Sequence, residues 1–190
     1  VTLGDFGRQD LKTVVQVPII EDQLGVKVFA ASIEHDGHVY NSYLDKMAGG
    51  DDKLNYGFTL LWEPNDQLSI KLHHEIMEDK SEQGVYVNRN PVGILACTIH
   101  QIGFDPNEGC EKDANDGPDL VESDGSNFSD NEYESTIFTV NYDTENFLYT
   151  YIYGLRDMDE QNMQDFDGAA VRMLRMNYFN DWEQTSHEFR

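Results

Sequence analysis

Hydrophobic and polar residues alternate along much of this chain with the two-residue period of a β-strand. Between residues 11 and 19 one side of the predicted strand carries Leu11, Thr13, Val15, Val17 and Ile19, and the other side carries Lys12, Val14 and Gln16. Comparable alternation recurs at 26–33, 56–62, 68–76, 138–142, 147–155 and from Trp182 onward. Helical periodicity is almost absent, so the pattern predicts an all-β protein with about seven strands.

The connections between these strands alternate between short and long. Short turns are predicted at 21–23, 63–66 and 143–146, and long polar stretches at about 35–53, 79–132 and 157–180. An up-and-down barrel places all short turns at one end and all long loops at the other, as outer-membrane barrels do. A soluble sandwich is under no such constraint.

Strand length and face chemistry agree with that architecture. The predicted strands reach the 9–11 residues that a tilted bilayer crossing needs. Aromatic residues near strand ends are typical of the interfacial girdles of membrane barrels; here they are Tyr56, Trp62, Tyr142, Phe147 and Trp182. The sequence thus predicts an antiparallel up-and-down transmembrane β-barrel with short periplasmic turns and long extracellular loops. Residues 1–190 would form part of one barrel domain, with 79–132 as a long acidic extracellular loop.

The net charge of the chain argues against some classes of binding partner. At pH 7 the formal charge is -23 and the sequence pI is about 4.3. Such a chain repels nucleic acid phosphates and anionic lipid headgroups, so no nucleic acid partner is expected. No run of 18 apolar residues is present, and the residues from Val1 onward do not show the basic start and apolar run of a signal peptide. Residues 184–190 read as the middle of a strand, so we expect an excerpt of a longer polypeptide.

Two cysteines and a group of acidic residues lie in the longest predicted loop. Cys97 and Cys110 are expected to form a disulfide, since no histidine or further cysteine stands at metal-ligand spacing. Asp113, Asp116 and Asp119 could supply oxygen ligands to Ca²⁺. The spacing departs from an EF-hand loop, and a solvated, self-repelling loop is the favoured interpretation. No other cofactor is expected.

The histidines do not predict a metal site. His73 and His74 are adjacent on a strand, so their side chains point to opposite faces and cannot chelate one ion. His35 and His38 flank an Asp-Gly turn and are expected on the turn surface.

Loop residues supply the candidate ligand contacts. Aromatic and amide side chains at a loop mouth commonly hold sugars, siderophores or peptides, and here they are Tyr40, Tyr43, Tyr86, Asn88 and Arg89. Packing within the loops is the competing and favoured interpretation. No nucleophile–base motif or phosphate-binding loop stands out, so no enzyme is expected.

Several segments resemble the TonB-dependent outer-membrane receptors. Residues 24–41 are similar to an early barrel strand and first hairpin of that family, and 15–20 to the strand upstream. Residues 60–69 resemble its leucine-tryptophan-x-proline periplasmic turn, and 184–190 a recurring strand. The resemblance implies the N-terminal part of a barrel wall without the plug domain. It implies import of a scarce nutrient (siderophore, vitamin or oligosaccharide) across the bacterial outer membrane, contact with its lipid, and coupling to TonB through the plug.

Two other classes remain open. One is a soluble, secreted all-β binding module with an acidic loop able to bind calcium. The other is a passive porin-like barrel, in which Lys27, Lys71 and His73 would line a water-filled lumen.

Overall fold

The computed structural model describes residues 1–87, 119–125, 127–170, 172 and 174–190. All regular elements in these residues are strands. Seven of them are long: β2 (Gln9–Ile20), β3 (Leu24–His35), β6 (Asp51–Asn65), β7 (Leu68–Asp79), β9 (Phe128–Asp143), β10 (Leu148–Asp165) and β11 (Arg175–Phe189). Four are short: β1 (Thr2–Leu3), β4 (Val39–Asn41), β5 (Lys46–Ala48) and β8 (Leu120–Val121).

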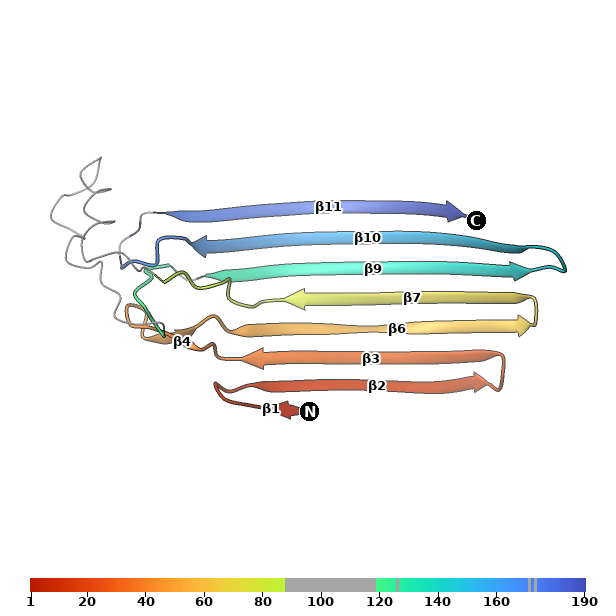
Figure 1. The fold of residues 1–190 in the computed structure, drawn as a ribbon, viewed down its shortest axis with the longest axis horizontal. Helices are drawn as coiled ribbons and strands as arrows, with labels where there is room; N and C mark the ends of the chain where they lie inside the picture. The colour runs from red at the N-terminus through yellow and green to blue at the C-terminus, as the bar shows by residue number, and fades with distance from the viewer. Residues whose placement is uncertain (88–118, 126, 171, 173) are drawn as a thin grey trace.

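The long strands form a single antiparallel sheet in chain order, β1-β2-β3-β6-β7-β9-β10-β11. Figure 1 shows the short turns gathered at one end of this sheet and the long connections at the other. We call these the turn end and the loop end. The predictions of an all-β protein and an antiparallel meander of seven principal strands are confirmed.

Several strands extend further into polar sequence than predicted. The predicted bounds of the loop 157–180 are wrong, because β10 continues to Asp165 and β11 begins at Arg175, so the connection between them is 166–174. β9 begins at Phe128, so the last residues of the predicted 79–132 loop belong to a strand. The ladder consists of backbone hydrogen bonds and needs no apolar side chains, so loss of hydrophobic alternation does not end a strand.

The register separates the side chains into two faces. Val26, Leu60, Leu72, Phe138 and Tyr153 form one row across adjacent strands. We call the face that carries this row the apolar face. The residues that alternate with these along each strand point to the opposite side of the sheet, which we call the polar face. One row of it consists of Lys27, Thr59, His73, Ile137 and Gly154.

The apolar face is not covered by any second layer among the described residues. Val15, Val28 and Trp62 on this face are 48%, 46% and 41% exposed. The buried apolar side chains lie instead at the loop end, in Val39, Ala48, Val121, Met158 and Ala169. A single sheet with one bare apolar face therefore holds only a small core of its own.

None of the described segments is a helix that could cross a membrane.

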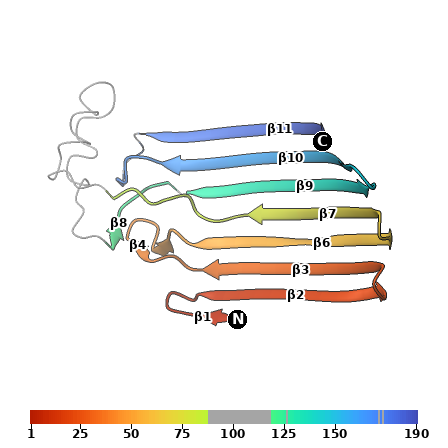
Figure 2. The same ribbon diagram turned by 45° about the vertical axis from the view of Figure 1, so that its right-hand side comes forward.

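A second, three-stranded sheet is built from the long connections. Its order is β5-β4-β8, with β4 antiparallel to β5 and parallel to β8. Figure 2 shows β4 and β8 at the loop end, beside the ends of the long strands. The connections at this end are thus partly ordered by pairing with each other.

Candidate functional site

The loop end carries a layer of connected segments that we call the loop cap. It comprises the described residues of 36–50, 80–87, 119–127 and 166–174. These segments are far apart in sequence, and hydrogen bonds between them hold them against the ends of the strands.

The joint between β4 and β8 is one such connection. The backbone N–H of Tyr40 donates to the carbonyl of Asp119 at 2.9 Å, and that of Ser42 to Val121 at 3.0 Å. Asn41 is 2% exposed, and its side-chain amide donates to the carbonyl of Ser123 at 2.9 Å. A buried amide that is hydrogen-bonded in this way fixes the relative position of the two segments.

Residues 80–87 cross over the polar face near the loop end. The Gln83 amide donates to Ser129 Oγ at 2.6 Å and to Asn162 Oδ1 at 2.8 Å. Glu82 accepts from Lys46 Nζ at 2.6 Å and from the backbone N–H of Gly49 at 2.9 Å. Asn162 becomes 1% exposed under this segment, so the polar face is closed over at this end.

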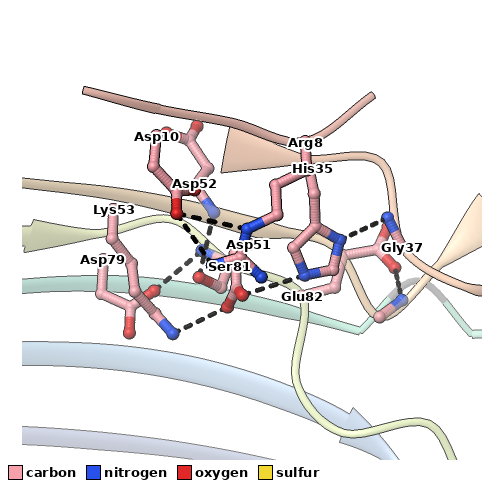
Figure 3. A network of polar contacts seen from close by, with 11 residues as sticks. Arg8, Asp10, His35, Gly37, Asp51, Asp52, Lys53, Asp79, Ser81 and Glu82 are labelled. Carbon is pink, nitrogen blue, oxygen red and sulfur yellow. Dashed lines mark hydrogen bonds and ion pairs between the residues drawn. The ribbon is translucent and has the colours of Figure 1, made fainter. Parts of the chain in front are cut away.

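A second network of polar contacts connects the ends of β3, β6 and β7 with the loop-cap segments 36–50 and 80–87, as Figure 3 shows. His35 Nε2 lies 2.9 Å from Asp51 Oδ2, and Lys53 Nζ lies 2.7 Å from Asp51 Oδ1. The hydrogen bond from Lys53 is the largest cause that lowers the pKa of Asp51. His35 is the last residue of β3 and its side chain is 16% exposed. The expectation that it lies on a turn surface is therefore wrong.

Two buried carboxyl groups anchor the turn between β10 and β11. Asp165 and Asp167 are 2% and 7% exposed. Asp165 Oδ2 accepts from Ser123 Oγ at 2.5 Å, and Asp167 accepts from the backbone N–H groups of Ala169 and Leu174 at 2.9 and 2.7 Å. Burial raises the pKa of Asp167 to about 6, outweighing these backbone donors. The turn is consequently expected to lose stability as the pH rises through about 6.

An ion pair closes the same region from the side of β11. Arg175 Nη2 lies 2.9 Å from Asp124 Oδ1, and both side chains are mostly buried. Gly125 lies against this pair, since a Cβ atom there would meet Arg175 Nε at 2.9 Å. The close approach explains why a residue without a side chain stands at 125.

The predicted ligand-contact residues are dispersed through the cap. The hydroxyl group of Tyr40 donates to Asp45, Tyr43 is 54% exposed, and the ring of Tyr86 lies 4.9 Å from that of Phe166. No contact among these three tyrosines is recorded in the part of the chain that the structure describes. Asn88 and Arg89 lie outside the described residues. A shared ligand site at these five residues stays a prediction.

The predicted disulfide and calcium ligands are largely beyond the described part of the chain. Cys97, Cys110, Asp113 and Asp116 all lie outside it. Asp119 lies within the described residues and is exposed, and its backbone carbonyl accepts a hydrogen bond from the N–H of Tyr40. Within the described ranges, no three His, Cys, Asp or Glu side chains come together as a metal site would require.

The adjacent histidines of β7 serve opposite faces, as predicted. His73 Nδ1 lies 2.9 Å from Thr59 Oγ1 on the polar face. His74 Nδ1 lies 2.9 Å from Thr136 Oγ1 on the apolar face. Each imidazole has a hydroxyl partner, which accounts for both residues without a metal.

Sequence reasoning missed the buried polar residues of the cap. Asn41, Asp165 and Asp167 were absorbed into stretches predicted as solvated loops. The Asp-Phe-Asp-Gly run at 165–168 was an available turn signal, and Gly168 has a φ of 62°. Nothing in the local pattern, however, indicated that these carboxyl groups would be buried.

Comparison of the chain with protein-family models, with curated proteins and with solved structures found no match.

Proposed function

We propose that this chain forms part of the wall of an outer-membrane receptor barrel that imports a scarce nutrient, with the apolar face toward lipid and the polar face toward the lumen. The observation that carries the proposal is the apolar face itself. It is exposed, continuous from β2 to β10, and bordered by aromatic side chains at the turn end. These include Trp62, Tyr142, Phe147 and Tyr149, which are 41%, 46%, 65% and 42% exposed.

The height of the apolar region supports a bilayer crossing. On β6 it runs from Leu54 to Trp62, a span of about 26 Å at about 3.3 Å per residue. At a tilt of about 40° this becomes about 20 Å along the membrane normal, close to the roughly 25 Å apolar band of outer-membrane barrels.

The loop-end border of the apolar region is level between Leu11 of β2 and Leu54 of β6, and it shifts toward the turn end between β6 and β10. The register places Leu54 of β6 level with Asp159 of β10, through Glu78 and Glu132. On β10 the last apolar residue of this face is Leu155, four residues short of that level. Three strand spacings thus shift the border by about 13 Å over about 14 Å, an angle of about 40°. Barrel strands tilt by 35–45°, so a flat membrane would cut the strands from β6 to β10 along such a line.

The two outermost long strands support a larger assembly. In the described sheet β11 pairs with β10 alone, and β2 pairs with β3 and, over two residues, with β1. Unpaired backbone groups cannot face lipid, because nothing there replaces their hydrogen bonds. Under this proposal further strands continue the wall on both sides, and a plug domain would couple it to TonB.

Fractionation and heat-modifiability test the proposal. The native polypeptide should sediment with outer membranes, require detergent for extraction, and migrate faster on a denaturing gel before boiling than after. A polypeptide that stays soluble and monodisperse without detergent would refute the receptor and favour the secreted binding module.

A further inference from the structure

Basic side chains are distributed unevenly between the two faces of the sheet. The chain has 13 Lys and Arg against 36 Asp and Glu, so every cation could find a carboxylate. The described residues nevertheless give no ion pair to Lys12, Lys27, Lys71 or Arg156. By register all four belong to the polar face.

Carboxylates lie on both faces of the sheet, and by register the polar face carries Asp10, Asp51, Glu75, Asp79, Glu160 and Glu188. Towards the loop end the apolar face gives way to acidic positions, namely Glu78, Asp130, Glu132, Glu134, Asp157, Asp159, Asp181 and Glu183. Directly opposed like charges such as Glu132 and Asp159 destabilise a sheet. Lys71 and Arg156 form no ion pair among the described residues, although Glu75 and Glu160 stand on the same strands and the same face.

Arg156 borders a hollow in the polar face. The hollow has a volume of about 270 Å³ and is lined by Ile137, Ile152, Gly154, Leu155, Arg156, Gln184 and Ser186. It lies where Gly154 supplies no side chain between its register partners Ile137 and Ser186. A Cβ atom on Gly154 would lie 2.7 Å from Ser186 Oγ, so the close approach of the Ser186 side chain requires a residue without a side chain at 154.

The lining combines hydrogen-bond donors with apolar walls. Arg156 presents a guanidinium that has no hydrogen bond or ion pair to any described residue. Gln184 offers an amide and Ser186 a hydroxyl group from the adjacent strand β11. A guanidinium is a permanent cation with only donors, and its fork matches carboxylate or phosphate oxygens. Ile137 and Ile152 would contact an uncharged part of the same ligand.

We propose that this hollow binds the carboxylate or phosphate group of a small organic anion with an apolar body. The inference rests on the proposed function in taking the polar face as the route of the cargo, and it adds the sign of the cargo's charge. Lys27 and Lys71, on β3 and β7 of the same face, are two further cations that form no ion pair with a described residue. The acidic loop favours cationic cargo on charge alone, and the geometry of the polar face favours the opposite sign.

Equilibrium dialysis of phenyl phosphate against the full native polypeptide tests the site. The polypeptide is used in the state in which it is isolated, with or without detergent, at low ionic strength. Wild-type protein should bind phenyl phosphate, and Arg156→Gln should weaken binding about tenfold because a charge-assisted contact is lost. Arg172→Gln is the matched control, since it removes the same charge from the β10–β11 turn and should leave binding unchanged.

Two further probes separate specific from general attraction. Inorganic phosphate should bind more weakly than phenyl phosphate, because it lacks the body that contacts Ile137 and Ile152. Benzyl alcohol, which lacks the anion, should bind more weakly still. Equal losses in the two arginine variants, or no binding of phenyl phosphate by wild-type protein, would overturn the proposal.

The result is separable from the fate of the receptor proposal. A soluble polypeptide that binds phenyl phosphate through Arg156 would keep the anion site and remove the receptor. A membrane-embedded barrel that does not bind phenyl phosphate would support the receptor proposal and refute the anion site.

Discussion

At the scale of single residues, Gly57 shows how the polar face is packed. It lies between Phe29 of β3 and Glu75 of β7, and the ring of Phe29 lies over it. A Cβ atom at position 57 would meet the carbonyl oxygen of His74 at 2.2 Å and Phe29 Cζ at 2.9 Å. The first of these contacts is with backbone, which cannot move aside without disturbing the ladder.

We expect Gly57→Ala to lower the free energy of unfolding by about 1–3 kcal/mol through overpacking. Gly25→Ala is the matched control, because a Cβ atom at that position meets nothing within 4 Å. Urea unfolding of the two variants in the same detergent measures the difference. Equal stability of both variants would contradict the prediction, because it would show that Phe29 and the β7 backbone move aside at little cost.

Asp167 makes the turn between β10 and β11 dependent on pH. Its pKa in the folded protein is raised to about 6 from the ordinary 3.8, chiefly by burial. A carboxyl group with a raised folded-state pKa contributes stability that is full below pH 4 and is lost as pH rises through 6. The nearby Asp165 carboxylate raises the pKa of Asp167 further.

The backbone amides of Ala169 and Leu174, which donate to Asp167, should therefore exchange faster relative to free amides as pH rises from 4 to 7. Asp167→Asn keeps the size of the side chain and should remove that dependence. Hydrogen exchange followed by mass spectrometry measures both. Parallel pH profiles in wild type and variant would assign the effect to other groups.

At the scale of residues, the sequence predicted correctly those features that depend only on strand geometry, such as the face to which a side chain points. Opposite faces for His73 and His74 follow from the two-residue period, whatever the tertiary structure. The burial of Asn41 and Asp165 depends on segments roughly 80 and 40 residues away, respectively, and no local pattern encodes those contacts.

At the scale of elements, the strands divide into two zones. Near the turn end they alternate apolar and polar residues, whereas near the loop end they are polar on both faces. The second zone was predicted as loop, since alternation was the only strand signal used. Its backbone ladder continues regardless, as the pairing of Asp165 with Arg175 shows.

The joint between β4 and β8 depends on Asn41. Its side-chain oxygen accepts from the N–H groups of Tyr43 and Leu44, both at 3.0 Å, while its amide donates to Ser123. Asn41→Ala should remove all three bonds and leave the buried carbonyl of Ser123 without this donor, at a cost of about 1–3 kcal/mol. We expect faster hydrogen exchange at Tyr40 and Ser42, whose N–H groups cross the joint.

Ser42→Ala is the control within the same joint, because the hydroxyl group of Ser42 makes only long contacts of 3.4 and 3.5 Å. It should change exchange at Tyr40 little. If both variants behave alike, the pairing of β4 with β8 does not depend on the buried amide.

At the scale of the whole molecule, the proposed function requires the sheet to form a boundary between lipid and water. One face carries an apolar region toward the turn end, and its border with the acidic positions lies four residues nearer the turn end on β10 than on β6. The other face is polar and carries cations, such as Lys71 and Arg156, that form no ion pair among the described residues. The alternating turn lengths were sufficient to predict the meander. They could not show this shift of the border, because it depends on the register between strands and not on any one strand.

The orientation of the two faces is the central claim, and adjacent residues of β7 test it most directly. A nitroxide label would be placed singly at Leu72 on the apolar face and at His73 on the polar face, in the native polypeptide reconstituted into lipid vesicles. Collision rates with oxygen, which concentrates in lipid, and with a water-soluble nickel chelate would then be measured by electron paramagnetic resonance. We predict that the label at 72 collides mainly with oxygen and the label at 73 mainly with the chelate. Equal access of the chelate to both positions, or the reverse preference, would contradict a lipid-facing apolar surface.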